Sequence, residues 1–332
     1  MNILIVNDTK IPAIKYGGTE RAIWSLGKAL VELGHEVSYL VGKGSACPFA
    51  KRVLFYDSNK SFDIQVPEDI DIVHFFWKPS DAAIKKPYIV TLQGNIYHPC
   101  KLDANTVFVS GNQAKRFGGS EFVYNGIDWN EYPKCDMALK RSEWFHFLAD
   151  ASWKVKNVRG AIRIARKAKM QLQVLGGSRL NFNMGFRFTP YLNIKFRGQV
   201  DNEKKAFYAN RSNGLLFPVL WHEPFGIAIT ESLFYGCPVF GTPYGSLTEL
   251  VLPEVGVVSN SESALVNALK NAGSFNKATC HEYAADKFNS VVMAKSYLKL
   301  YEKVLNGNTI HLQQPEIKAE TIQQKKYLDM LP

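Results

Sequence analysis

The sequence lacks long apolar runs, and this absence argues against a membrane-spanning helix. No stretch of the 332 residues approaches the ~20 consecutive apolar residues that a helix needs to cross a bilayer. The N-terminal stretch MNILIVND indicates a buried strand, and it has neither the basic start nor the cleavage site of a signal peptide. We therefore expect a cytoplasmic protein.

Cysteine and metal-binding patterns are also scarce. The five cysteines are odd in number, widely scattered and without a C-x-x-C pair: Cys47, Cys100, Cys135, Cys237 and Cys280. This pattern argues against both a disulfide framework and a zinc site. The one D-x-D motif, Asp69 to Asp71, precedes a predicted strand, at the end opposite the expected ligand crevice. We therefore expect no metal and no cofactor.

Two nucleotide-binding fingerprints are missing. There is no G-x-G-x-x-G after the first strand and no G-x-x-x-x-G-K-[ST] anywhere, which disfavours a Rossmann dehydrogenase and a P-loop enzyme. The formal net charge of +10 favours anionic partners, but no zinc-finger or RNA-recognition pattern accompanies it. We expect no nucleic acid. Phosphorylated ligands or peripheral membrane association would suit this charge, and a solvated basic surface explains it equally well.

What is present is a repeated alternation of strands and helices. The apolar fraction of 46% and charged fraction of 21% are typical of a globular protein, and the length suits two domains. In the first half, an apolar strand at 2–7 precedes a helix in which Ile23, Leu26 and Leu30 recur at helical spacing. Strands separated by helices predict an α/β fold with doubly wound parallel sheets.

The domain boundary is predicted at the polar, Gly- and Pro-containing stretch YNGIDWNEYPK. We expect a first domain over 1–132, a linker over 133–142 and a second domain over 143–289. A C-terminal helix over 290–306 is expected to cross back to the first domain, and residues 307–332 form a polar tail.

Two groups of residues are placed to meet an anion. Gly17 and Gly18 precede a helix N-terminus after the first strand, where backbone N–H groups can approach a ligand closely; a simple turn is the alternative. Lys154, Lys156 and Arg159 follow a strand of the second domain and open a helix. Basic residues are unfavourable at a helix N-terminus, which suggests a ligand, although a solvated helix start explains them too.

A third feature is the stretch WHEPFGIAITES, in which Glu223 and Glu231 lie eight positions apart. Glu231 is the only charged residue between Glu223 and Glu249, on a helix predicted from Pro224 to about Tyr235. A buried carboxylate is costly unless it accepts charge-assisted hydrogen bonds. Either a ligand diol such as a ribose or a structural Arg or Lys could supply them.

The segment EPFGIAITE resembles the E-x7-E signature of retaining GT-B glycosyltransferases of family 4. Three further segments resemble the same family: YGGTERAIWSLGKALVELGHEV, VSGNQAKRFGG with VYNGID, and LLFPVLWHEPFGIAITESLFYGCPVFGTPYGSLTELV. The resemblance runs from residue 1 to about 305. It implies a GT-B fold, in which an acceptor-side domain and a nucleotide-sugar-binding domain, both Rossmann-like, face a crevice.

The resemblance also implies roles for individual residues. Glu231 would bind the nucleotide ribose, and Glu223 would contact the donor sugar near the reacting carbon. Backbone amides around Phe225 and Gly226 would hold sugar hydroxyls. Lys156 would neutralise the departing diphosphate.

Other positions implied by the resemblance match the family's pattern less closely. Gly17 and Gly18 would approach the diphosphate, and Gly198 to Val200 would lie near the base. The family commonly has an arginine a few residues before its lysine; here either Lys154 replaces it or the second cation is absent. Gln93 occupies the position of the family's T-x-H-G histidine, so no histidine is assigned a catalytic role.

The implied activity is retaining, metal-independent hexosyl transfer from a nucleoside diphosphate sugar to a hydroxyl. The acceptor would be a saccharide or lipid-linked saccharide, in surface polysaccharide or glycolipid assembly at the cytoplasmic face of a membrane. A GT-B sugar-nucleotide epimerase and a non-catalytic nucleotide-sugar-binding protein are the alternatives.

Overall fold

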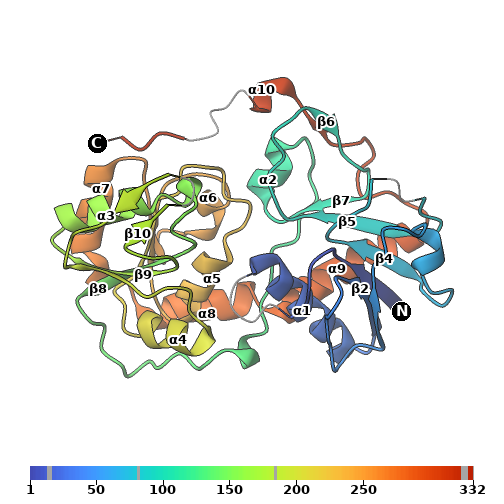
Figure 1. The fold of residues 1–332 in the computed structure, drawn as a ribbon, viewed down its shortest axis with the longest axis horizontal. Helices are drawn as coiled ribbons and strands as arrows, with labels where there is room; N and C mark the ends of the chain where they lie inside the picture. The colour runs from blue at the N-terminus through green and yellow to red at the C-terminus, as the bar shows by residue number, and fades with distance from the viewer. Residues whose placement is uncertain (13–16, 81–82, 183–184, 323–327, 332) are drawn as a thin grey trace. The chain divides into compact units, whose positions relative to one another are not determined.

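The computed structural model describes residues 1–12, 17–80, 83–182, 185–322 and 328–331. The chain divides into two compact units (Figure 1). Unit 1 combines Met1–Trp129 with Phe288–Gln323, and unit 2 combines Asn130–Lys287 with Gln324–Pro332. Each unit is therefore built from two separate segments of the chain.

Unit 1 is organised around a six-stranded parallel sheet of order β3-β2-β1-β4-β5-β7. Its central strand β1 is buried from Ile3 to Val6, as expected for a parallel strand covered on both faces. The strands are β1 (Asn2–Val6), β2 (Glu36–Val41), β3 (Arg52–Phe55), β4 (Ile72–Phe75), β5 (Tyr88–Leu92) and β7 (Thr106–Phe108).

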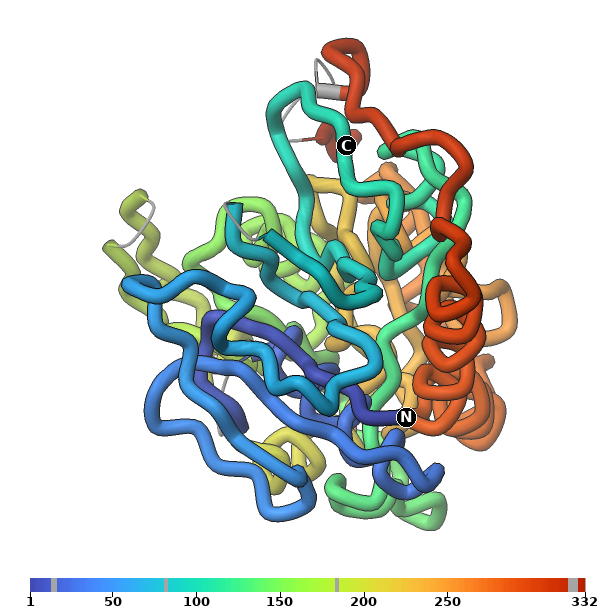
Figure 2. Tube along the Cα trace, turned by 90° about the vertical axis from the view of Figure 1, so that its right-hand side faces the viewer, coloured from blue at the N-terminus to red at the C-terminus, as the bar shows by residue number. Residues whose placement is uncertain are grey.

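The last long helix of the chain belongs to unit 1. Helix α9 (Ser290–Leu305) packs beside α1 (Gly18–Glu32) and against β5, and Figures 1 and 2 show α9 alongside the first unit's elements. The two helices share a core that includes Leu26, Leu30, Met293 and Tyr297. The other elements are η1 (Asp63–Gln65), α2 (Gly111–Arg116), α10 (Ala319–Ile322) and the antiparallel pair β6 (Cys100–Lys101) and β16 (Glu316–Ile317).

Unit 2 repeats the same plan with a second six-stranded parallel sheet, of order β12-β9-β8-β13-β14-β15. Two doubly wound parallel sheets confirm the predicted fold class. The strands are β8 (Trp144–Leu148), β9 (Gln171–Leu175), β12 (Ile194–Phe196), β13 (Leu215–Phe217), β14 (Val239–Gly241) and β15 (Gly256–Val258).

One connection in unit 2 departs from the usual strand–helix–strand rhythm. Parallel neighbours are normally joined by a crossover helix, yet the described residues between β9 and β12 form a hairpin of β10 (Leu180–Asn181) and β11 (Arg187–Phe188). The helices of unit 2 are α3 (Val158–Lys167), α4 (Asn202–Ala209), α5 (Ile227–Phe234), α6 (Leu247–Leu250), α7 (Glu262–Lys270) and α8 (Lys277–Lys287). Short 3-10 turns occur at η2 (Trp129–Glu131), η3 (Lys154–Lys156) and η4 (Ala272–Ser274).

Candidate functional site

The candidate site lies beyond the carboxyl ends of the neighbouring strands β8 and β13 in unit 2. This edge of an open parallel sheet is where ligands of such folds bind. The loop after β8 carries η3, and the loop after β13 leads to α5. The two loops are joined directly, because the backbone N–H of Leu220 donates to the carbonyl of Val155 at 2.8 Å.

At this edge Lys156 and Glu223 form a buried ion pair. The Lys156 Nζ lies 2.6 Å from the Glu223 Oε2, and the two residues are only 9% and 5% exposed. The indole N–H of Trp221 donates to the same oxygen at 2.8 Å. The ammonium also lies 4.8 Å from the ring centroid of Trp221 and 5.2 Å from that of Phe217. The cation is therefore held by a carboxylate and two aromatic faces.

The backbone around Glu223 is clamped to the loop that follows β14. The N–H of Ser246 donates to the Glu223 carbonyl at 2.9 Å, and the Ser246 hydroxyl donates to the Phe225 carbonyl at 2.6 Å. Gly245 has φ +67, and a Cβ there would lie 2.3 Å from the Glu223 backbone N and O. Only glycine permits this approach. No motif or spacing in the sequence distinguishes Gly245 or Ser246 as part of this site.

Helix α5 begins just after the EPFG segment. Its N-cap is Gly226, with φ +84 and no side-chain cap, and Phe225 is buried. The helix covers Ile227–Phe234, within the predicted stretch from Pro224 to about Tyr235. It brings Glu231 into the buried interior of unit 2.

Glu231 has a structural cation partner. Its Oε1 accepts a hydrogen bond from the Tyr132 hydroxyl at 2.7 Å and forms an ion pair with the Lys205 Nζ at 2.5 Å. The carboxylate and the lysine are each 4% exposed. The structural-lysine alternative is therefore realised, and the ribose role stays a prediction. Nothing in the sequence singles out Lys205, because its exposed neighbour Lys204 on the same helix is chemically identical.

A buried histidine fixes α5 to the sheet beneath the site. His146, on β8, shares hydrogen bonds of 2.8 Å with the hydroxyls of Ser212 and Ser232, and Ser232 belongs to α5. Burial lowers the pKa of His146 to about 3, although the Glu231 carboxylate opposes this shift. The imidazole is therefore neutral, and it positions the helix that carries Glu231.

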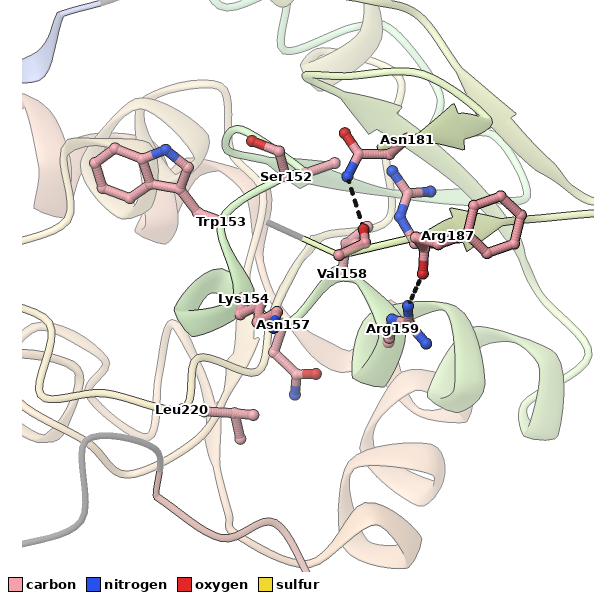
Figure 3. Close-up of a pocket in the computed structure, with 12 residues that line it drawn as sticks. Ser152, Trp153, Lys154, Asn157, Val158, Arg159, Asn181, Arg187 and Leu220 are labelled. Carbon is pink, nitrogen blue, oxygen red and sulfur yellow. Dashed lines mark hydrogen bonds between the residues drawn. The ribbon is translucent and has the colours of Figure 1, made fainter. Parts of the chain in front are cut away.

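The two lysines of η3 have different surroundings. Lys156 is buried, whereas Lys154 is exposed and lines a separate pocket of about 510 Å³ (Figure 3). The turn ends at Asn157, which has φ +56 and whose side chain accepts from the N–H of Gly160 and donates to the Pro218 carbonyl. Asn157 thereby ends η3 and caps α3.

The remaining candidates lie in several places. Gly198, with φ +69, and the buried Val200 follow β12 at the same edge of the unit 2 sheet. Gly17 is the N-cap of α1, which begins at Gly18, and both glycines belong to unit 1. Gln93, also in unit 1, exchanges two hydrogen bonds of 2.9 Å with the side-chain amide of Asn125.

The two aspartates of the D-x-D motif form contacts with neighbouring residues of unit 1. Asp69 pairs with Lys51 and Arg52, and these hydrogen bonds lower its pKa to about 2; Asp71 accepts from the backbone N–H of Asn2 at 2.7 Å. Among the residues that the structure describes, no group of three His, Cys, Asp or Glu side chains could hold a metal ion. Within those same residues, no helix is long and apolar enough to cross a membrane.

Comparisons with known proteins agree with this architecture. Residues 151–278 match the family described as "Glycosyl transferases group 1". An uncharacterised 41.2 kDa protein in the cps region of Klebsiella pneumoniae is 28% identical in an alignment of 148 positions that covers 42% of this chain and 40% of that protein. The match therefore spans well under half of the relative's length.

Similar solved structures cover nearly the whole chain. AviGT4, a glycosyltransferase involved in avilamycin A biosynthesis, has a TM-score of 0.75 and 19% identity over 93% of this chain and 99% of its own. Sucrose-phosphate synthase from Thermosynechococcus elongatus has a TM-score of 0.68 and 15% identity, over 92% of this chain and 100% of its own. HepE from Anabaena, in complex with UDP and glucose, has a TM-score of 0.64 and 14% identity, over 91% of this chain and 100% of its own. The chain therefore has a GT-B fold, and residues 151–278 of its second unit are similar to the glycosyl transferases group 1 family.

Proposed function

We propose that this protein is a glycosyltransferase that moves a sugar from a nucleoside diphosphate sugar to a hydroxyl acceptor. The buried Lys156–Glu223 pair carries the proposal, because it places opposite charges at the ligand-binding edge of the group 1 domain. The Anabaena neighbour, which has been solved in complex with UDP-glucose, supports a nucleotide sugar as the donor class.

The pair suggests how the leaving group would be stabilised. Lys156 is already oriented by Trp221 and Phe217, so its ammonium would meet the departing diphosphate with little reorganisation. Glu223 would then exchange its lysine partner for hydroxyls of the donor sugar. Each buried charge would keep a partner throughout, which avoids the large cost of an uncompensated ion.

Glu231 would contribute to nucleotide binding from the next helix. Lys205 and Tyr132 fix the orientation of its carboxylate and compensate its charge. Ribose hydroxyls would add charge-assisted hydrogen bonds to the same group. In this assignment Lys205 holds the Glu231 carboxylate in the orientation that binds the two ribose hydroxyls.

The other assigned positions complete the proposed site. Amides around Phe225 and Gly226 would hold the donor sugar, and Gly198 and Val200 would lie near the base. In addition, Lys154, Gly17 and Gly18 would face the diphosphate.

We further propose a family 4 enzyme that retains the anomeric configuration and needs no metal, the leaving phosphate helping to deprotonate the acceptor. The acceptor would be a saccharide or a lipid-linked saccharide in surface polysaccharide or glycolipid assembly. The relative in a cps region supports this setting. The reaction would take place at the cytoplasmic face of a membrane, with peripheral association.

Calorimetric titration with UDP, GDP and ADP, with NAD as the control, tests the donor class. We expect one nucleoside diphosphate to bind clearly and NAD not to bind. The corresponding sugar nucleotides would then be screened for transfer in the presence of a strong chelator, and NMR of the product would give its anomeric configuration. Turnover of the donor without any acceptor would indicate an epimerase, and binding without turnover over a broad acceptor set would indicate a nucleotide-sugar sensor.

A further inference from the structure

The positive charge of the chain is concentrated in one segment. Residues 151–200 contain eleven of the forty Lys and Arg residues and none of the thirty Asp and Glu residues. The other 282 residues hold 29 basic and 30 acidic side chains, which nearly cancel. The formal charge of +10 therefore comes entirely from this basic segment of unit 2.

Few of these basic side chains are neutralised by carboxylates from elsewhere. Lys156 pairs with Glu223, and Arg163 and Lys167 both pair with Glu262. Within the described part of the chain, the other eight form no ion pair. A solvated basic face usually alternates with acidic residues, so a run of fifty residues without one points to an anionic partner.

Three of the unpaired cations converge on the pocket shown in Figure 3. Lys154, Arg159 and Arg187 line this pocket of about 510 Å³, and no carboxylate is present among its described lining residues. Arg187 is only 6% exposed and donates to the Thr189 hydroxyl and to a backbone carbonyl. Arg159 donates to the carbonyl of Phe186. Neutral acceptors thus hold two guanidinium groups in place without cancelling their charge.

The pocket adjoins a strongly apolar surface. The hairpin between β9 and β12 replaces a crossover helix, and the segment around it leaves large side chains in solvent. The exposed fractions lie between 45% and 88% for Leu180, Phe182, Phe186, Phe188 and Leu192. Several aromatic and aliphatic side chains in so short a stretch mark an interaction site.

We propose that this hairpin and the adjoining basic pocket form a docking surface for an anionic membrane. The apolar side chains enter the headgroup–acyl boundary, and the exposed Arg159 meets lipid phosphates, with the charge of the buried Arg187 behind it. Charge complementarity selects this occupant, because the surface combines an apolar stretch with cations that have no carboxylate. The inference deepens the membrane association in the proposed function, and it names the part of the chain that provides it.

Vesicle sedimentation of the full chain tests the docking surface without any nucleotide. We expect binding to phosphatidylcholine vesicles that contain about a third phosphatidylglycerol, at least about tenfold stronger than to pure phosphatidylcholine and weakened by salt. Phe182→Ser combined with Phe186→Ser should lower this binding about tenfold or more. Arg159→Glu should weaken it several-fold.

Matched controls use positions outside the surface. Ile64→Ser removes a similarly exposed apolar side chain from unit 1, and Lys270→Glu reverses an exposed charge on α7. Both should bind vesicles as the unaltered chain does, and circular dichroism should show the same fold for every variant. Because the Phe186 carbonyl is backbone, its hydrogen bond with Arg159 survives the serine substitution.

Several results would overturn the docking surface. These are equal binding to both vesicle types, hairpin variants that bind like their controls, and release of the vesicles by millimolar inorganic phosphate at constant ionic strength. Binding to an oligonucleotide with no vesicle binding would assign the surface to nucleic acid instead. If vesicles fail to bind while a nucleoside diphosphate still binds in calorimetry, the proposed function stands and the docking surface falls.

Discussion

The two units bury polar side chains in contrasting ways. In unit 1, His74 shares hydrogen bonds of 2.7 Å with the hydroxyls of Tyr301 and Thr91, and Thr91 shares one of 2.9 Å with Tyr297. Burial lowers the pKa of His74 to about 3 and raises the pKa values of both tyrosines. This network is therefore neutral, and its members satisfy one another.

Unit 2 contains a comparable neutral network around His146, but it also holds two buried ion pairs. Lys156 with Glu223 and Lys205 with Glu231 place four charges near one edge of the sheet. A neutral network can stabilise a core, whereas buried ion pairs contribute little net stability against their desolvation cost. The contrast therefore sets a neutral network that stabilises the fold of unit 1 against two ion pairs of unit 2 whose charges we propose a ligand uses.

The strongest test of the contrast is Lys156→Gln. It removes the charge assigned to the diphosphate, and we expect turnover to fall on the order of a hundredfold or more. Steady-state kinetics measures the loss, with Lys154→Gln on the same turn as a control of smaller effect. Because Glu223 loses its cation, stability should also fall, by up to ~3 kcal/mol. Normal kinetics for Lys156→Gln would remove the ionic pair from the proposed mechanism.

Glu231→Gln sharpens the same contrast at the second pair. We expect nucleoside diphosphate affinity to weaken roughly tenfold, because a neutral amide accepts weaker hydrogen bonds from the ribose. Calorimetry gives the dissociation constant. Tyr132→Phe is the matched control, since it removes one hydrogen bond from Glu231 and leaves the carboxylate in place. An unchanged dissociation constant for Glu231→Gln would contradict the ribose role.

The buried histidines predict a pH dependence in each unit. His74 and His146 have folded-state pKa values of about 3, well below the ordinary value of 6.5. Between these values the unfolded chain binds more protons, so the free energy of unfolding falls as pH is lowered from about 6.5 toward 3. The slope should be up to ~1.4 kcal/mol per pH unit for each histidine.

Denaturant unfolding at several pH values measures this slope. In the variants His74→Gln and His146→Gln, as long as each folds, the free energy of unfolding should change less per pH unit than in the unaltered protein. Identical slopes in both variants and the unaltered protein would mean that these imidazoles do not remain neutral in the fold.

The smallest expected effect concerns Tyr301→Phe. It removes a hydroxyl from the neutral network and leaves His74 Nδ1 without that partner, which should lower the free energy of unfolding by ~1–3 kcal/mol. Nucleotide affinity should stay unchanged, because the network belongs to unit 1, whereas Glu223 and Glu231 belong to unit 2. Denaturant unfolding and calorimetry report the two quantities. A large loss of nucleotide affinity with no loss of stability would instead mean that the network of unit 1 serves ligand binding rather than stability.

The sequence was informative where local pattern decides structure. Short β-branched and aromatic runs predicted the parallel strands, and the spacing of Leu26 and Leu30 predicted α1. The apolar setting of Glu231 correctly raised the question of its partner. Local sequence could not identify its two partners, because Lys205 comes from another helix and Tyr132 is the last residue of the range expected for the first domain, although it belongs to unit 2. Contacts of this kind depend on tertiary packing, which local spacing does not encode.

Two other features depended on backbone geometry. Lys154 and Lys156 have similar sequence surroundings, and the short turn ending at Asn157 buries one and exposes the other. Gly245 is one of 24 glycines, and only the close approach of the Glu223 backbone distinguishes it.

The interleaving of the two units has a consequence for synthesis on the ribosome. Tyr297 and Tyr301, which complete the polar network around His74, are translated more than two hundred residues after it. Unit 2 waits still longer, because the backbone of Leu331 is hydrogen-bonded to Asn260 and Glu262. A nascent chain stopped after Trp129 would hold a sheet that lacks its last helix. Unit 1 therefore reaches its final form only after Tyr301 has been made and unit 2 only after Leu331, and neither unit is encoded by one continuous stretch of the gene.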